Sequence, residues 1–540
     1  MPDLRRLPDI LPIALAVWLL ATLVGVWSGR LLHPFDLEWM EGGMLAHAWR
    51  IQRGMALYGP PDASFIPFVY PPGYSTVLAG IGGLGELGYA QGRALSLVGA
   101  LAAAGALVIG VVRQPERDGV VATGAAAAFL GCYAHSGAFY DLVRPDGLSL
   151  GLLAWAIVAA LSRRPVWAGL LLAGAFWCKH SAALYGVPLA LGLLTRDGLR
   201  PALRFAIAAV APALTATILV QSWSGGHFLR YLLLVPGSHP LIWGRVWPLT
   251  PSELGFALPV LLPAVAIAAL LVPGRRLPPM VMVALPVAAA AVATGLALSW
   301  GATAPTALIG HASLSAALGA VLVQGVDLRI TRTRPSGEWV FAVGLGVTAL
   351  ASAMLMRGHQ GGYVNVHMPA HWIACLGAGL ALAHWRAHDS RVAVPWVVAG
   401  LLAAQLGMQR AEVVAADLVP SSADQIAGDA LVADLARQRG PVLSPYAVWL
   451  PVSAGHDPAM HQIGLMDIDH PGGPYHADVA RIEATILAGS FGTVLDANRP
   501  IGHRVDDAYR VERVVLPRDD PAMQPRSGWG VKPFRLLVPR

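Results

Sequence analysis

Charged side chains are scarce in this 540-residue chain. Asp, Glu, Lys and Arg make up 13% of the residues, whereas a soluble domain carries about 25%. Hydrophobic residues make up 55%, and the mean hydropathy is +0.56. This composition excludes an ordinary soluble domain. The net charge of +6 is carried almost entirely by arginines in short loops between apolar segments, which indicates membrane topology rather than nucleic-acid binding.

Cysteines and repeats are also scarce. The three cysteines all fall in apolar segments, which gives neither a disulfide framework nor the spacing of metal ligands. No internal repeat is evident, so the sequence does not support the paired halves of many transporters. We expect no cleavable signal peptide, because the first apolar run, Ile10 to Trp27, is too long and lacks a convincing cleavage site.

Apolar segments of roughly 20 residues, the length that crosses a bilayer, recur along the chain. Arginine-rich loops between them place the N-terminus in the cytoplasm and the C-terminus outside it. We therefore predict an α-helical polytopic protein of the inner (plasma) membrane with about 13 transmembrane helices. The predicted spans are 10–29, 93–112, 119–137, 147–162, 166–178, 181–194, 205–222, 256–273, 279–299, 304–325, 338–356, 367–385 and 392–408.

The chain divides into two parts of different composition. Residues 1–410 form the predicted membrane domain, in which residues 30–90 are a long first extracytoplasmic loop with interfacial helices. Residues 411–540 are richer in Asp, His, Pro and Arg and contain strand-like runs at 441–445 and 491–496, preceded by a helical stretch at 424–438. This pattern predicts a small soluble α/β domain outside the cytoplasm.

Lys179 is the most informative residue of the chain. It is one of two lysines, the other being Lys532, and it lies in the otherwise apolar stretch 173–185. A charge at membrane depth costs about 3 kcal/mol on the lower published scales, so an intramembrane lysine predicts a functional site. An ammonium at that depth needs an anion as its partner.

The other notable polar residues fall on the same, far face of the membrane and come from four separate loops. Their common depth predicts a single pocket. A carboxylate there can accept a proton from a hydroxyl nucleophile, and lysine and arginine can neutralise a phosphate. The residues are Asp36, Glu38 and Glu41; Asp141, Arg144 and Asp146; Lys179 and His180; and Arg357, His359 and Tyr363.

Each of these residues also has a structural interpretation. The carboxylates of the first loop could be solvated, and Arg144 could form a structural ion pair with Asp141 or Asp146. Asp146 could also stabilise the start of the fourth span through the helix dipole, and Arg357 could snorkel at the membrane interface. Lys179 is explained least well in this way, because lysine is so rare in the chain.

Metal ligands are not evident in the sequence. His359, His367 and His371 fall close together, but they lack a matching carboxylate, so we interpret them as interfacial residues. His180 is interpreted as a packing or hydrogen-bonding neighbour of Lys179. We therefore expect neither a metal ion nor a cofactor.

The order and spacing of these motifs resemble the GT-C superfamily of membrane glycosyltransferases, and most of all the protein O-mannosyltransferases and lipid A aminoarabinose transferases. Those families carry an acidic pair in the first loop, a Pro-Pro turn, an aspartate that opens the fourth span, a span broken by lysine and a late basic-then-tyrosine loop. The likeness covers about residues 10–385, and no single motif is diagnostic. The matching segments are Glu41 to Tyr58, Val69 to Tyr74, Arg144 to Asp146, Gly169 to Lys179 and Arg357 to Tyr363.

Two departures from the family pattern matter. The acidic pair appears here as Met40-Glu41, so the position of the family's base is open among three carboxylates of the first loop. The basic residue that often precedes Pro-Pro is Tyr70 here, so neutralisation of a phosphate would depend more on Lys179 and Arg357.

The resemblance implies an inverting, metal-independent transfer of a sugar from a polyprenyl-phosphate donor to a hydroxyl of a lipid, polysaccharide or protein acceptor. The abundance of arginine, alanine and glycine with almost no lysine is typical of a GC-rich bacterial genome, so we expect a role in a bacterial cell envelope. The implied catalytic residues are Glu41, Asp36, Glu38 and Asp146; the implied donor-phosphate ligands are Lys179, Arg357, Arg144, His180 and Tyr363; and the implied pocket residues are Tyr58, Tyr70 and Asp141.

Two other classes of protein stay open. A transporter or flippase of an anionic lipid-linked sugar would also place cations in a membrane pocket, but it would need polar groups accessible from both faces, and the cytoplasmic face has few. A non-catalytic scaffold built around the C-terminal domain would explain the tail but not Lys179. The sequence does not reveal the sugar, the acceptor or the oligomeric state.

Overall fold

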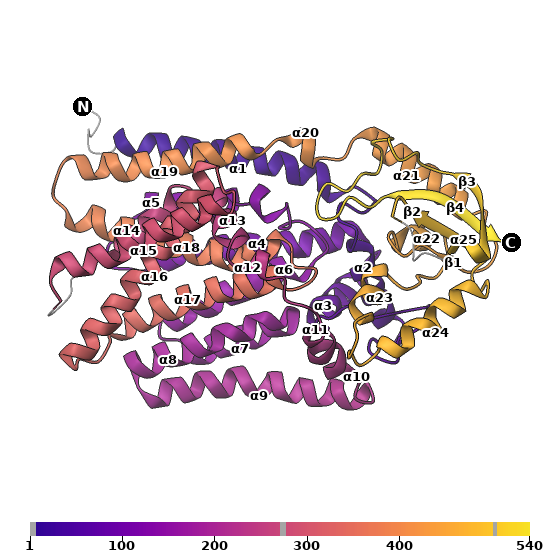
Figure 1. Cartoon of the computed structure of the whole chain (residues 1–540), viewed down its shortest axis with the longest axis horizontal. Coiled ribbons are helices and arrows are strands. Elements are labelled where there is room, and N and C mark those ends of the chain that lie inside the picture. Colours follow the sequence, from indigo (N-terminus) through magenta and orange to yellow (C-terminus); the bar gives the residue numbers. More distant parts are fainter. Residues whose placement is uncertain (1–6, 271–276, 500–504) are drawn as a thin grey trace.

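The computed structural model describes residues 7–270, 277–499 and 505–540 and is mostly helical. Long helices lie side by side in a bundle, and a small sheet lies at one end of it (Figure 1). Helix α1 (Leu7–Leu31) begins at the end of the bundle opposite to the sheet. The two ends of the described chain are therefore separated by the length of the bundle.

The helices of the bundle overlap the predicted apolar runs, although several begin or end five or more residues from the predicted bounds. Seven helices are long and apolar enough to cross a membrane, or eight if one bent pair is a single span, and three more are shorter and apolar, all within the described residues. The fold class of a helical, multi-pass membrane protein is confirmed, and the count of 13 spans stays a prediction. The further bundle helices are α4 (Tyr89–Val112), α5 (Gly119–Gly131), α6 (Pro145–Leu161), α7 (Pro165–Cys178), α8 (Gly186–Asp197), α9 (Leu199–Trp223), α13 (Leu249–Ala257), α14 (Leu261–Leu270), α15 (Pro279–Ser299), α16 (Pro305–Thr331), α17 (Gly337–Gly358), α18 (Met368–His388) and α19 (Ala393–Glu412).

The predicted continuous span at 256–273 is wrong within the described residues. The helical segments Trp243–Ala257 and Leu261–Leu270 meet at a bend of 106°. Leu258 is in a non-helical conformation, because the proline that follows it disfavours the helical region and has no N–H to donate. Gln405 of α19 accepts hydrogen bonds from two backbone N–H groups at the start of α14, which satisfies donors that the break leaves free. Residues 271–273 of this span lie outside the described residues.

Helices α4 and α6 approach each other through glycine. A Cβ at Gly147 would lie 2.2 Å from the Ser96 carbonyl oxygen, and a Cβ at Gly151 would lie 2.5 Å from that of Gly99. Only glycine permits backbones this close, and small residues at helix contacts are the usual device inside membranes. The contact fixes the first turn of α6, which carries Asp146.

Short helices lie between the bundle and the sheet, except for Trp243–Val246, which lies against the bundle itself (Figure 1). Two of them belong to the predicted first loop, and the others follow α9. They form an interfacial layer that connects the bundle to the C-terminal part of the chain. They are α2 (Glu41–Gln52), α3 (Gly73–Gly82), α10 (His227–Leu229), η4 (Arg230–Leu234), α11 (Val235–Gly237) and α12 (Trp243–Val246).

The C-terminal part is a mixed α/β structure. Its four strands have the order β1-β2-β4-β3; β1 is parallel to β2, and the other pairs are antiparallel. The strand-like runs at 441–445 and 491–496 appear as β1 and β2, and the helical stretch at 424–438 as α21. The elements are α20 (Ala415–Leu418), α21 (Ser422–Leu435), β1 (Val442–Leu443), α22 (Trp449–Ser453), α23 (Gln462–Ile468), α24 (His476–Leu487), β2 (Thr493–Ala497), α25 (Val505–Ala508), β3 (Tyr509–Val514) and β4 (Pro533–Pro539).

The C-terminal part packs tightly on the first loop. The Leu37 carbonyl accepts hydrogen bonds from the backbone N–H groups of Arg526 and Ser527, and a Cβ at Gly428 would lie 2.1 Å from the Phe35 ring. One hydrophobic cluster contains buried residues of α2, α3, α23 and α24 together. The first loop and the C-terminal part therefore form one continuous core.

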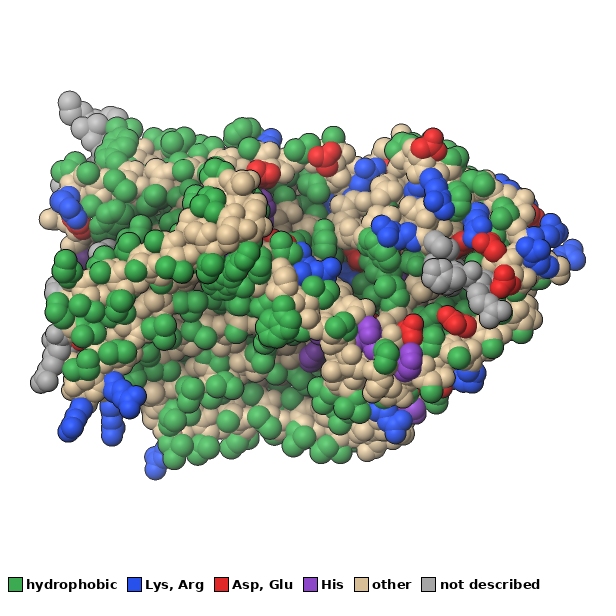
Figure 2. Space-filling view, in the orientation of Figure 1, with side chains coloured by type: hydrophobic (Ala, Val, Ile, Leu, Met, Phe, Trp, Pro, Cys, Tyr) green, Lys and Arg blue, Asp and Glu red, His purple; other side chains and the backbone are tan. Residues whose placement is uncertain are grey.

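The surface follows the same division. Figure 2 shows hydrophobic side chains spread over the helical part, whereas Lys, Arg, Asp and Glu side chains gather over the C-terminal part and at the opposite end of the bundle. An apolar belt bordered by charge at both ends is the surface that a membrane-spanning bundle presents to lipid.

Replacing Gly151 by alanine should destabilise the bundle, because the new Cβ would meet the backbone of α4. We expect a loss of about 1–3 kcal/mol in the free energy of unfolding, measured as a lower midpoint of thermal unfolding in detergent. The control is Gly105→Ala on α4, where a Cβ meets nothing within 4 Å. Equal midpoints for the two variants would contradict the close packing of α4 and α6.

Candidate functional site

A cavity of about 740 Å³ lies where the bundle, the interfacial helices and the C-terminal part meet. It is lined from all three directions, so segments far apart in the sequence contribute to one site. Several of the residues singled out from the sequence face this cavity. They are Glu38, Tyr70, Arg144, Lys179, His180, His359 and Tyr363.

Arg144 is the central cation of the cavity. Its guanidinium lies 3.2 Å from Glu38 Oε2, donates to the Tyr70 hydroxyl at 3.0 Å and lies 3.9 Å from Asp146 Oδ2. Arg144 is the extended residue that precedes α6, and Pro145 occupies the first helical position, which suits a helix start. Asp146 then lies in the first turn, where the helix dipole favours a carboxylate.

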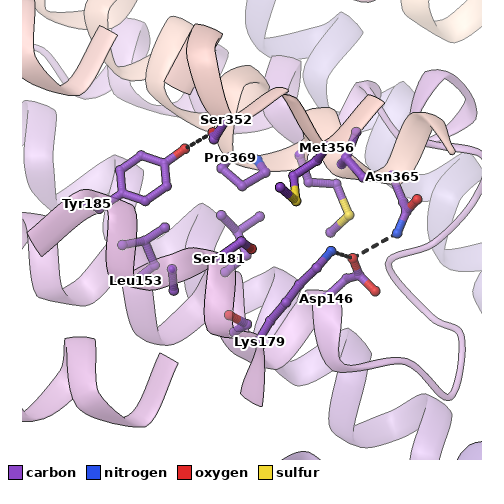
Figure 3. Close-up of a pocket in the computed structure, with 14 residues that line it drawn as sticks. Asp146, Leu153, Lys179, Ser181, Tyr185, Ser352, Met356, Asn365 and Pro369 are labelled. Atoms are coloured by element: carbon purple, nitrogen blue, oxygen red, sulfur yellow. Dashed lines mark hydrogen bonds and ion pairs between the residues drawn. The ribbon is translucent and has the colours of Figure 1, made fainter. Parts of the chain in front are cut away.

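Lys179 forms an ion pair with Asp146. Its Nζ lies 2.6 Å from Asp146 Oδ1, and the Asn365 amide donates to the same oxygen at 2.8 Å (Figure 3). Helix α7 ends directly before Lys179, which has an extended backbone and is followed by a short 3-10 helix, η3 (His180–Tyr185). This break places the ammonium at the cavity rather than inside a continuous span.

A second, smaller pocket of about 30 Å³ lies behind this ion pair (Figure 3). It extends between α6, η3 and α17, where the Tyr185 hydroxyl is hydrogen-bonded to Ser352 at 3.1 Å. Its size corresponds to about two water molecules. Lys179 thus separates a large cavity from a small one.

Glu38 is the carboxylate of the first loop that faces the cavity. It is 2% exposed, and burial raises its pKa to about 7, although the Arg144 guanidinium acts in the opposite direction. The neighbouring charges of Glu41 and Asp146 also raise this pKa. A carboxylate with a pKa near neutrality is suited to accept a proton and release it again.

Glu41 has a different environment. Both of its oxygens accept hydrogen bonds from Arg93 of α4, and they also accept from the backbone N–H groups of Leu37 and Val143. Burial alone would raise the pKa of Glu41, but Arg93 and these N–H groups bring it below its usual value. The side chain is fully buried and does not line the cavity, so the geometry favours an anchoring role over that of a base.

Asp36 and Asp141, both singled out from the sequence, also lie away from the cavity. Asp36 accepts from the Gly42 N–H at 2.8 Å, and its pKa is raised because it is desolvated and lies near Glu41. Asp141 is paired with Arg30 at 2.7 Å and accepts from a tyrosine hydroxyl. The structural interpretation of Asp141 as an ion-pair residue thus holds, but its partner is Arg30 and not Arg144.

Arg357 does not line the cavity either. It is held by both oxygens of Glu253, at 2.7 Å for the closest pair, and it donates to the Gly362 carbonyl. Glu253 also lies 2.7 Å from His367 Nε2. Arg357 does not point into the cavity. It instead orders the loop that carries Tyr363, and this loop lines the cavity.

Tyr58, the remaining predicted pocket residue, is buried and donates to the Tyr70 carbonyl.

Sequence reasoning missed many of the residues that line the cavity, and three of them matter most for its chemistry. Arg245 of α12 is partly buried, and its guanidinium has no hydrogen bond or ion pair to the described residues. Asp467 of α23 and Trp529 come from the C-terminal part. No local sequence signal distinguishes these residues, because only the tertiary fold brings them to Arg144 and Lys179.

One group of possible metal ligands lies outside the cavity. Within residues 7–270, 277–499 and 505–540, three such ligand atoms come within 4.8 Å of one another at Glu116, His384 and His388. This group lies at the end of the bundle away from the sheet, where Arg386 pairs with Asp9 of α1. The expectation that the reaction needs no metal stays a prediction.

The solved structures that match the chain include two of one protein. One is ArnT from Cupriavidus metallidurans bound to undecaprenyl phosphate, with 16% sequence identity and a TM-score of 0.41; the other is the same protein in the apo state, with 15% identity and a TM-score of 0.42. In both cases the match covers 82% of this chain and 85% of the other chain. No family model and no curated protein sequence matches the chain.

Replacing Glu41 by glutamine should destabilise the fold rather than only remove activity, because Arg93 would lose its buried counter-charge. Breaking such a pair costs about 3–5 kcal/mol, which should lower the midpoint of thermal unfolding in detergent. Glu86→Gln, an exposed acid of the same loop, is the matched control. If the Glu41 variant unfolds at the same temperature as this control, the anchoring role is wrong.

Proposed function

We propose that the chain is a membrane glycosyltransferase that moves a sugar from a polyprenyl-phosphate donor to a hydroxyl acceptor on the extracytoplasmic side. The observation that carries the proposal is the composition of one cavity. It holds a carboxylate of near-neutral pKa, Glu38, together with the cations Arg144, Lys179 and Arg245, and it borders on apolar side chains that face outward.

The cations favour a phosphate as ligand. Lys179 and Arg144 already neutralise Asp146 and Glu38, so a further anion is best placed near Arg245, whose charge is uncompensated among the described residues. Arginine binds phosphate as a fork, and lysine binds it as a point charge. Arg357 supports this arrangement indirectly, because it holds the loop of Tyr363 in place.

The lipid chain of the donor has a route out of the cavity. Leu233 and Ile242 line the cavity and are also exposed, by 56% and 36%, and Trp243 beside them is 73% exposed. Exposed apolar side chains at the edge of a membrane bundle are in contact with lipid. A polyprenyl tail can thus lie in the bilayer while its phosphate occupies the cavity.

The chemistry follows from this placement. Glu38 accepts the proton of the acceptor hydroxyl, and the oxygen attacks the anomeric carbon on the face opposite to the phosphate, which inverts the configuration. The bond between the anomeric carbon and the phosphate oxygen breaks, and the polyprenyl phosphate leaves with the electron pair and one additional negative charge. The surrounding cations stabilise that charge as it develops. No metal ion is needed to protonate or activate this leaving group.

A flippase for the same lipid is the second candidate. The termini of the described chain lie at opposite ends of the bundle, and the cavity lies near only one of them. Radiolabelled sugar that appears on an acceptor in membranes supplied with the lipid-linked donor supports the transferase. Movement of the lipid across the bilayer without bond transfer supports the flippase.

Glu38→Gln should lower kcat by about 10²–10⁴-fold, the usual contribution of a general base, while the donor still binds. Since the ionised carboxylate is the base, kcat/KM of the wild type should rise as the pH passes through about 7, where Glu38 ionises, and fall at lower pH. The variant should lack this rise. The measurement is transfer of labelled sugar between pH 5.5 and 8.5, with Glu86→Gln as control. A variant that keeps both the rate and the pH profile would exclude Glu38 as the base.

Lys179→Met should lower transfer by about 10²–10³-fold, because the charge on the departing phosphate would lose its ammonium partner. Lys179→Arg keeps the charge and should retain more activity than Lys179→Met. Thermal unfolding of both variants shows whether they are folded, since Asp146 loses the ammonium of Lys179 in Lys179→Met. Retention of more than about a tenth of the rate in folded Lys179→Met would contradict the role of Lys179.

A further inference from the structure

The C-terminal part of the chain builds one wall of the cavity. It contributes side chains of α23 and of the loop before β4. This wall is rigidly attached to the first loop: His461 Nε2 donates to the Trp39 carbonyl at 2.8 Å, while its Nδ1 accepts from the Ile463 N–H. The wall is thus part of the site and not a loose cover. The cavity residues that it supplies are Ile463, Met466, Asp467, Gly528 and Trp529.

Asp467 is the one acidic side chain that this wall presents to the cavity. Its backbone carbonyl accepts from His239 Nε2 at 2.7 Å, which fixes the end of α23 against the segment after α11. Its carboxylate has no hydrogen bond among the described residues, although it lies close enough to Tyr70 to raise the pKa of that hydroxyl and close enough to Arg144 for the guanidinium to lower the pKa of Asp467. Burial raises the pKa of Asp467 to about 7. A half-buried carboxylate without a protein partner is available to accept hydrogen bonds from a ligand in the cavity.

The surroundings of Asp467 fit a sugar ring. Trp39 and Trp529 both line the cavity, and their rings lie 5.2 Å apart at an angle of 76°. Indole rings offer an apolar face together with a polar N–H group, which matches a sugar with its C–H face and its hydroxyls. Gly528, at φ +71°, brings this wall within contact of Glu38, since a Cβ there would lie 2.9 Å from Glu38 Cγ. The acid on the wall and the proposed base therefore face one enclosed space.

We infer that Asp467 is a specificity-determining residue that hydrogen-bonds to hydroxyls of the donor's sugar, which Trp529 packs against. The inference rests on the proposed function and names a subsite for it. The phosphate is held on the membrane side by Lys179 and Arg245, and the sugar extends from there toward the C-terminal wall. A carboxyl group suits this task because it accepts from a hydroxyl when ionised and can donate when protonated.

The test compares two lipids on the full-length protein in detergent. Undecaprenyl phosphate without a sugar and undecaprenyl phosphate that carries glucose, mannose or arabinose are titrated while tryptophan fluorescence is followed, since two tryptophans line the cavity. Asp467→Asn should weaken the sugar-bearing lipid that the wild type prefers by about tenfold, and it should leave the sugar-free lipid within about twofold. Asp467→Glu, which keeps the carboxylate, should recover part of the loss.

Asp469→Asn is the matched control, because Asp469 is exposed, pairs with His476 and does not line the cavity. In the transfer assay, Asp467→Asn should raise KM for the donor by about tenfold and change kcat by less than about threefold, unlike Glu38→Gln. A loss of kcat at constant KM would overturn the inference, because Asp467 would then act in the chemistry.

Three binding results would also overturn it: equal affinity of the wild type for the two kinds of lipid, equal weakening of both by Asp467→Asn, or no effect of the variant. In each case transfer by the wild type would leave the proposed function in place. Absence of transfer to any acceptor, combined with selective loss of the sugar-bearing lipid, would instead refute the proposed function and keep Asp467 as a sugar-binding residue.

Discussion

Glu41 connects the segments that form the cavity. Its two oxygens receive Arg93 of α4, the N–H of Leu37 in the first loop and the N–H of Val143, which directly precedes Arg144. A buried carboxylate with all its acceptor sites occupied stays ionised and rigid. Glu38 and Arg144 are each close in sequence to a residue that Glu41 binds, so this side chain helps to set the position of one relative to the other, together with their direct ion pair.

Two acids of one loop thus acquire opposite properties. Glu41 is surrounded by donors, which bring its pKa below the usual value, whereas Glu38 is desolvated with only one cation nearby and ionises near pH 7. Such a separation of pKa values is the usual sign that one carboxyl group is structural and the other can exchange a proton. The pair lies at the place where the sequence resembles the acidic motif of the GT-C superfamily, but the motif alone does not show which acid is which.

The membrane bundle was largely predictable, because bilayer thickness and arginine placement constrain every span separately. Apolar length and flanking charge predicted helices such as α15 and α16 within a few residues. The break between α13 and α14 was missed, since it depends on a proline within an apolar run and on the distant Gln405. Lys179 was identified as a site residue because a charge in an apolar segment is locally visible.

Partners that meet only in three dimensions were not predictable. Nothing in the sequence indicates that Glu253 neutralises Arg357, because the two residues are more than a hundred positions apart. Asp467 was missed for the same reason, because it reaches the cavity through contacts between the C-terminal part and the first loop. Both cases show that charge and spacing reveal which residues are costly to bury but not what compensates them.

The shared wall also has a consequence for the order of biogenesis. The cavity combines residues 38–366 with residues 463–529, and a polypeptide is made from its N-terminus onward. A nascent chain that has inserted its bundle already carries Glu38, Arg144 and Lys179. The wall of the cavity that residues 463–529 supply is still missing at that stage, so the cavity is open to water. The cavity is complete only after residues 463–529 have been made and have packed on the first loop, so docking of the C-terminal part is the final assembly step of the site.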